Sequence, residues 1–169
     1  MIPRRYLCAS AATLCVVALD QASKAWLRHF LPQEGGVFPL LPGCLQLTHR
    51  LNPGIAFSLF HGQAWAPVVF SVVAVLAAVA IAWMLWRYAA LPALLAVAFG
   101  LIAGGALGNL CDRLHAPYMV LDFIDCYLGQ YHWPAFNVAD SAVCCGVGIL
   151  LLSNFTHPDA LLGTPQLAD

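Results

Sequence analysis

The sequence predicts an all-α membrane protein with four transmembrane helices, folded as a single domain over residues 1–169. Composition is the first reason: hydrophobic residues make up 62% of the chain and charged residues 9%, whereas a soluble domain carries about 25% charged residues. The second reason is that residues 64–86, 88–111 and 141–158 contain no charged side chain. About 20 apolar residues cross a bilayer core about 30 Å thick. The net charge of −1 excludes a basic nucleic-acid-binding face.

The first helix is expected at about residues 6–26. Arg4 and Arg5 precede its apolar run, as in a secretory signal peptide. The run ends in leucine, aspartate and glutamine at positions 19–21, and not in a small-residue cleavage site. We therefore expect this segment to be retained as a transmembrane helix.

The other three helices are expected at about residues 64–86, 88–111 and 138–156. Trp65 begins the second helix, and Trp83 and Trp86 lie near its end. A rise of 1.5 Å per residue separates them by roughly 27–32 Å. Indole rings prefer the two membrane–water interfaces, so this helix spans the bilayer.

The third helix carries Gly100, Gly104 and Gly108 at four-residue spacing. Small residues at this spacing let a second helix approach closely. Ala142 and Gly146 of the fourth helix predict that this helix is the partner.

Four alternating spans place the segments 27–63 and 112–137 on the same side of the membrane. Pro39, Pro42 and Gly43 punctuate the first segment and predict short strands around them. The second segment is rich in aromatic residues, and we expect it to be a loop on the membrane surface. Most of the unusual polar residues gather on this side: Asp20, Lys24, His49, Arg50, Asn52, Asn109, Asp112, Arg113, Asp122, Asp125, Asn137 and Asp140.

The opposite side receives both termini and the turn at Arg87. Arg4 and Arg5 flank the first span closely, and basic flanks favour the cytoplasm. We therefore expect both termini in the cytoplasm, although the polar side also carries basic residues.

Purely structural interpretations exist for several of these polar residues. They are Asn137 or Asp140 as a helix N-cap, Asp20 with Lys24 as an i,i+4 pair, and Asp112 beside Arg113 as an interface anchor. An ionisable group at membrane depth costs about 2.5–3.5 kcal/mol on insertion scales. Several aspartates on one side therefore favour a functional site.

Two carboxyl groups held close together cannot both ionise easily, so one keeps its proton. The ionised group can activate water and the protonated group can polarise a carbonyl, as in aspartic proteases. Six histidines and seven cysteines are scattered along the chain, so we expect no metal, no cofactor and no catalytic cysteine. These arguments do not select which two aspartates form the pair.

Five segments resemble the lipoprotein signal peptidase (signal peptidase II) family, in family order and with family-like spacing. They are D-Q-A-S-K at 20–24, N-P-G-I-A-F-S at 52–58, G-G-A-L-G-N-L-C-D-R at 104–113, V-L-D-F-I at 120–124 and F-N-V-A-D-S-A at 136–142. Pro53 and Ile55 depart from the residues usual in the family.

The resemblance implies four transmembrane helices with a small extracytoplasmic β-rich cradle, and catalysis by Asp122 and Asp140. It also implies residues that bind substrate or support the site: Asn52, Gly54, Asn109, Arg113, Asn137, Ala139, Asp20 and Lys24. The implied enzyme is a multi-pass aspartic endopeptidase of the bacterial cytoplasmic (inner) membrane, with its active site near the outer surface.

The substrate implied by the resemblance is a diacylglyceryl-modified prolipoprotein, cut before the lipidated cysteine. Globomycin-like peptides are implied as inhibitors, membrane lipids as partners, and a monomer as the working state. The alternatives are a small proton-coupled transporter or channel that uses the aspartates as a relay, and a structural membrane scaffold. A relay should place acids through the full membrane depth, whereas the second predicted helix has none.

Overall fold

The computed structural model describes residues 2–53, 65–88, 90–115 and 117–156. Four long helices form its body, each long and apolar enough to cross a membrane. They are α1 (Arg4–Phe30), α2 (Ala66–Arg87), α3 (Ala93–Leu114) and α4 (Val138–Thr156). The expected four-helix membrane fold is therefore confirmed.

Two helix boundaries differ from the expected ones for identifiable reasons. Helix α3 begins at Ala93 and not at residue 88, with Pro92 as its N-cap. Proline lacks an N–H and disfavours helical geometry in the residue before it, so the helix starts after it. Helix α1 continues to Phe30, whose ring stacks on that of Trp26 at a centroid distance of 5.0 Å.

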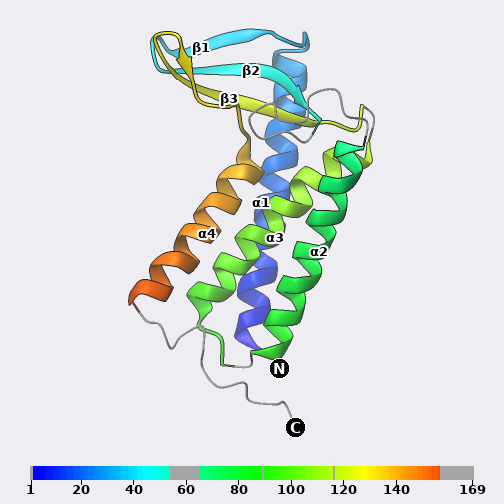
Figure 1. Cartoon of the computed structure of the whole chain (residues 1–169), viewed down its shortest axis with the longest axis vertical. Coiled ribbons are helices and arrows are strands. Elements are labelled where there is room, and N and C mark those ends of the chain that lie inside the picture. The colour runs from blue at the N-terminus through cyan, green and yellow to red at the C-terminus, as the bar shows by residue number, and fades with distance from the viewer. Residues whose placement is uncertain (1, 54–64, 89, 116, 157–169) are drawn as a thin grey trace.

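Helix α3 lies at the centre of the bundle and packs against α1, α2 and α4 (Figure 1). The predicted partner of its glycine stripe is wrong for two of the three glycines. Gly100 and Gly104 face α1, where a Cβ would meet Ala9 and Val16. Gly108 alone of the three also faces Ala139 of α4. The spacing reports close approach, but it does not identify the approaching helix.

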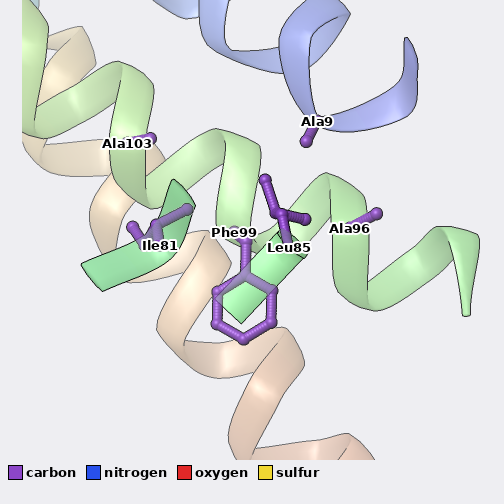
Figure 2. Close-up of a cluster of buried hydrophobic side chains, with 6 residues drawn as sticks. All are labelled: Ala9, Ile81, Leu85, Ala96, Phe99 and Ala103. Carbon is purple, nitrogen blue, oxygen red and sulfur yellow. The ribbon is translucent and has the colours of Figure 1, made fainter. Parts of the chain in front are cut away.

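One end of the bundle has a purely apolar core. Leu85 of α2 and Phe99 of α3 are buried there with Ala9 of α1 (Figure 2). Small alanines from α1 and α3 let the three helices approach, and larger side chains fill the remaining space.

A four-stranded antiparallel sheet lies across the other end of the bundle (Figure 1). Its strands follow chain order: β1 (Val37–Leu41), β2 (Leu45–Asn52), β3 (Val120–Leu128) and β4 (Tyr131–His132). Gly43 and Gly129, with φ of 92° and 62°, occupy the turns β1–β2 and β3–β4. These left-handed conformations favour glycine.

The expected loop in the second segment is wrong where β3 forms. Residues Val120 to Phe123 of this strand are all buried. A strand covered on both faces reads as a continuous apolar run and lacks the alternation of a half-exposed strand. Leu121 and Phe123 pack with Leu27 of α1 and Leu47 of β2, which attaches the sheet to the bundle.

Candidate active site

Asp122 lies in β3, where its side chain is buried with 2% relative exposure. Its Oδ2 accepts a hydrogen bond of 2.8 Å from Nδ2 of Asn52, which ends β2. Its Oδ1 accepts a bond of 2.7 Å from Nδ2 of Asn137. The cross-strand pairing of β2 with β3 thus brings Asn52 to a residue 70 positions away in the chain.

Asp140 lies in the first turn of α4. Its backbone N–H donates to Oδ1 of Asn137 at 3.0 Å, and the N–H of Asn137 donates to Oδ2 of Asp140 at 3.1 Å. This reciprocal pair is a capping box, which satisfies donors that the helix start leaves free. The N-cap interpretation is therefore correct, but the cap leaves Oδ1 of Asp140 to accept a 2.8 Å bond from Nδ2 of Asn109.

Asn137 connects the two carboxyl groups. It is fully buried, its side chain donates to Asp122, and its backbone N–H donates to Asp140. Its Nδ2 also lies 3.1 Å from Oδ1 of Asn109. One asparagine therefore holds a strand carboxyl and a helix carboxyl in a single hydrogen-bond network.

Burial raises the pKa of Asp122 from its ordinary value to about 7. The charge of Asp140 acts in the same direction, whereas the hydrogen bonds from Asn52 and Asn137 favour the ionised form and oppose the rise. Asp122 is therefore poised to hold or release a proton near neutral pH, as a general acid or base requires.

A buried ion cluster lies beside these carboxyl groups. Nζ of Lys24 is 2.8 Å from Oδ2 of Asp20 and 2.8 Å from Oδ2 of Asp112. The i,i+4 interpretation of Asp20 and Lys24 is correct, but the pair is only part of the cluster. Arg28 adds a second cation, 3.2 Å from Oδ1 of Asp112.

Asp112 does not pair with its neighbour Arg113. The guanidinium of Arg113 instead lies 5.6 Å from the ring centroid of Phe70 in α2. Its Nη1 donates to the carbonyl oxygen of Asn109 at 3.3 Å. Its Nε is buried and has no hydrogen-bond partner among the described residues.

All but one of the predicted site residues fall within the described chain. The structure brings nine of them into one polar region at the sheet end of the bundle: Asp20, Lys24, Asn52, Asn109, Arg113, Asp122, Asn137, Ala139 and Asp140. Gly54 lies outside the described residues. Among the residues that are described, no group of three or more His, Cys, Asp or Glu side chains could hold a metal ion.

Sequence reasoning missed the connection of Asp112 to this site. Its Oδ2 accepts a hydrogen bond of 3.3 Å from the backbone N–H of Leu121. The available signal was its spacing of three residues from Asn109, which places both on one face of α3.

Comparisons with known proteins agree on one family. The family model described as signal peptidase (SPase) II matches residues 12–156. A protein named lipoprotein signal peptidase from Syntrophomonas wolfei is 51% identical over 140 residues, which cover 82% of this chain and 86% of the relative. Another of that name, from Photorhabdus laumondii, is 42% identical over 146 residues and 85% of each chain.

A solved structure described as a bacterial membrane enzyme shares the fold. Its TM-score is 0.77 at 26% sequence identity, over 95% of this chain and 94% of the other. A second structure with the same description has a TM-score of 0.78, again at 26% identity.

Proposed function

Because the chain belongs to the signal peptidase II family, we propose that it is an aspartic endopeptidase that removes signal peptides from diacylglyceryl-modified prolipoproteins, with Asp122 and Asp140 as its catalytic pair. One observation carries the proposal: Asn137 donates hydrogen bonds to both carboxyl groups, which lie on different elements. This arrangement supports two acids that work on one scissile bond.

The two acids take different roles in the proposed reaction. Asp122, with its pKa of about 7, carries the proton and polarises the carbonyl of the scissile bond. Asp140 is the ionised base, because the N-terminus of α4 favours a negative charge in its first turn. It takes a proton from water, the resulting hydroxide attacks the carbonyl carbon, and a tetrahedral intermediate forms. That proton then moves to the departing amine as the peptide bond breaks.

Arg113 supports substrate binding in this proposal. Its buried Nε has no protein partner within the described part of the chain, and a buried donor without a partner costs about 1–3 kcal/mol. A carbonyl oxygen of a bound peptide would satisfy it. Arg113 also donates to the carbonyl oxygen of Asn109, whose side chain donates to Asp140, so such a peptide would lie beside the proposed catalytic pair.

The position of the site favours a lipid-bearing substrate. Asp140 begins a membrane-spanning helix, and Asp122 lies in the strand against the end of the bundle. The scissile bond must therefore lie near the membrane surface. Each buried methylene contributes about 0.8 kcal/mol of membrane anchoring, so two acyl chains on the cysteine hold it at that depth. We propose that cleavage occurs before this cysteine.

The proposed location is the bacterial inner membrane, with both termini in the cytoplasm and the sheet on the outer side. Arg4, Arg5 and Arg87 all lie at the end of the bundle opposite the sheet (Figure 1). Basic residues at helix ends favour the cytoplasmic side.

A proton relay receives no comparable support. Every acidic side chain in the described ranges lies at the sheet end: Asp20, Glu34, Asp112, Asp122, Asp125 and Asp140. Transfer across the bilayer would need groups at other depths as well.

The test uses purified protein and one precursor in two forms, with and without its diacylglyceryl group. Wild type should cleave the lipidated form far faster. Asp122→Asn and Asp140→Asn should each lower kcat by about 10³-fold or more, since acid–base catalysis contributes 10²–10⁴-fold per group. Equal cleavage of both precursor forms would remove the assigned substrate class.

Asp125→Asn is the matched control. Asp125 is also a buried aspartate of β3, but it is bonded to Gln46 and His132 and not to the asparagines of the site. This variant should keep kcat within about threefold of wild type, whereas near-normal turnover by either Asp122→Asn or Asp140→Asn would refute the catalytic pair.

A further inference from the structure

We propose that Lys24 is a positioning residue that sets the spacing of the two catalytic aspartates, acting through Asp20 and Asp112. The inference rests on the proposed function, because it assigns a role in that same reaction to residues that do not touch the substrate.

Two branches of contacts start at the ammonium group of Lys24, one through Asp20 and one through Asp112, and each ends at a backbone N–H. Its Nζ lies 2.8 Å from a carboxylate oxygen of Asp20 and 2.8 Å from one of Asp112. Oδ1 of Asp20 accepts a hydrogen bond of 3.0 Å from the backbone N–H of Ala139. Oδ2 of Asp112 accepts one of 3.3 Å from the backbone N–H of Leu121.

The two backbone groups held in this way have equivalent positions in the chain. Ala139 directly precedes Asp140, and Leu121 directly precedes Asp122. Each branch therefore holds the backbone N–H of the residue that precedes a proposed catalytic aspartate. Because one ammonium holds both branches, it fixes the start of α4 relative to β3.

A third contact of Lys24 reaches the catalytic pair from the side. Its Nζ donates to Oδ1 of Asn109 at 3.0 Å, and Nδ2 of Asn109 donates to Asp140. A lysine has three N–H donors, so these contacts with Asp20, Asp112 and Asn109 use all of them. An ammonium can only donate, so it holds the carbonyl end of the Asn109 amide and turns the NH₂ end towards Asp140.

Stability alone does not explain the cluster. Lys24 and Asp20 are fully buried, and Asp112 is 5% exposed. Desolvation of buried ion pairs commonly offsets their attraction, and well-packed apolar residues are often as stable or more so. Geometry is the better explanation, since a misplacement of about 1 Å in an active site can cost 10²-fold in rate.

The test measures kcat, KM and the melting temperature of full-length variants in one detergent with the lipidated precursor. Lys24→Met keeps the length of the side chain and removes all three donors. It should lower kcat by about 30-fold or more and leave KM within about threefold. Lys24→Arg keeps the charge in a planar group that does not match the three acceptors, so its kcat should be intermediate. The pH dependence of kcat should also shift in Lys24→Met, because the coupling between Asp122 and Asp140 changes with their separation.

Two controls separate positioning from general damage. Arg28→Gln removes the other cation of the cluster, whose side chain is 43% exposed and, among the described residues, is bonded to Asp112. This variant should keep kcat within about threefold. Leu85→Ala destabilises the far end of the bundle and should lower the melting temperature with kcat retained. If Leu85→Ala loses kcat as strongly as Lys24→Met, general destabilisation explains the loss and the inference is wrong.

The remaining outcomes also decide the question. A folded Lys24→Met variant with kcat near that of wild type, or with a change in KM alone, overturns the inference and leaves the proposed function intact. If Lys24→Met does not fold, two other variants carry the test: kcat should be intermediate for Lys24→Arg and should fall by about 30-fold or more for Asp112→Asn. If wild type itself fails to cleave the lipidated precursor, the proposed function fails.

Discussion

The two ends of the helix bundle are specified by different interactions. At the end opposite the sheet, Leu85 and Phe99 fill the space between small alanines, and the contacts are non-directional (Figure 2). At the sheet end, buried groups such as Lys24, Asp122 and Asn137 are joined by directional hydrogen bonds. Apolar packing tolerates adjustment of shape, whereas a polar network fails when one member is lost. Substitutions at the apolar end should therefore mainly change thermal stability, and substitutions at the sheet end should mainly change kcat.

The strongest effect on kcat in this comparison is expected from Asn137, which donates hydrogen bonds to both proposed catalytic carboxyl groups. Asn137→Ala removes the bridge and the N-cap together. We expect kcat to fall by about 10²-fold through loss of geometry, and stability to fall by about 0.5–2 kcal/mol through loss of the cap. Steady-state kinetics and thermal melting of the purified variant measure the two effects.

Asn137→Ser separates these two consequences. Serine also caps helices well, but it lacks the amide group that donates to Asp122. Stability should therefore recover while kcat stays low. Recovery of kcat together with stability would show that the cap alone is the role of Asn137.

A smaller effect on kcat is expected from a change in pH. Because Asp122 is proposed to react in its protonated form, kcat should fall as pH rises through its pKa of about 7. Asn52→Ala removes a hydrogen bond that favours the ionised form, so the midpoint of this fall should move to higher pH. A kcat that rises through the same range would assign the proton to Asp140 instead.

The same pKa predicts how stability depends on pH. The folded protein binds more protons than the unfolded chain between the ordinary pKa of an aspartate and about 7, so this group lowers stability as pH rises through that window. Asp122→Asn removes the effect. Its melting temperature relative to wild type should therefore be higher at about pH 8 than at about pH 4.

The smallest effect on chemistry is expected at the apolar end. Leu85→Ala leaves a cavity against Phe99, and such changes cost about 2–5 kcal/mol in soluble cores. We expect a lower melting temperature with kcat and KM unchanged below the transition. A variant with unchanged melting temperature and reduced kcat would show that the two ends are coupled.

The sequence predicted the parts of the fold that depend on composition and chain order. Long charge-free windows define the helices, and alternation of the spans brings residues as distant as Asn52 and Asn137 to one side of the membrane. The proposed catalytic pair, by contrast, followed from the family resemblance, because carboxylate chemistry alone does not select among the aspartates.

The missed features depend on contacts between distant segments. The strand β3 is buried on both faces, so its sequence lacks the alternation that predicts a strand. The pairing of Asp112 with Lys24 joins α3 to α1, and local spacing within either helix does not reveal it. Gly100 and Gly104 likewise pack against α1, and the spacing of the glycines within α3 does not reveal which helix they contact.

The capping box at the start of α4 links the position of Asp140 to the thickness of the bilayer. Asp140 belongs to the first turn of a helix of 19 residues, which at 1.5 Å per residue is about 28 Å long. This length is close to the thickness of a bilayer's hydrocarbon layer, and a helix adapts to a thicker or thinner layer by tilting or by distorting the lipid. The height of the carboxyl group is thereby tied to the depth of the helix. Under the proposed function, bilayer thickness would set how far the lipidated cysteine must move to reach Asp140, and the lipid environment would therefore affect turnover.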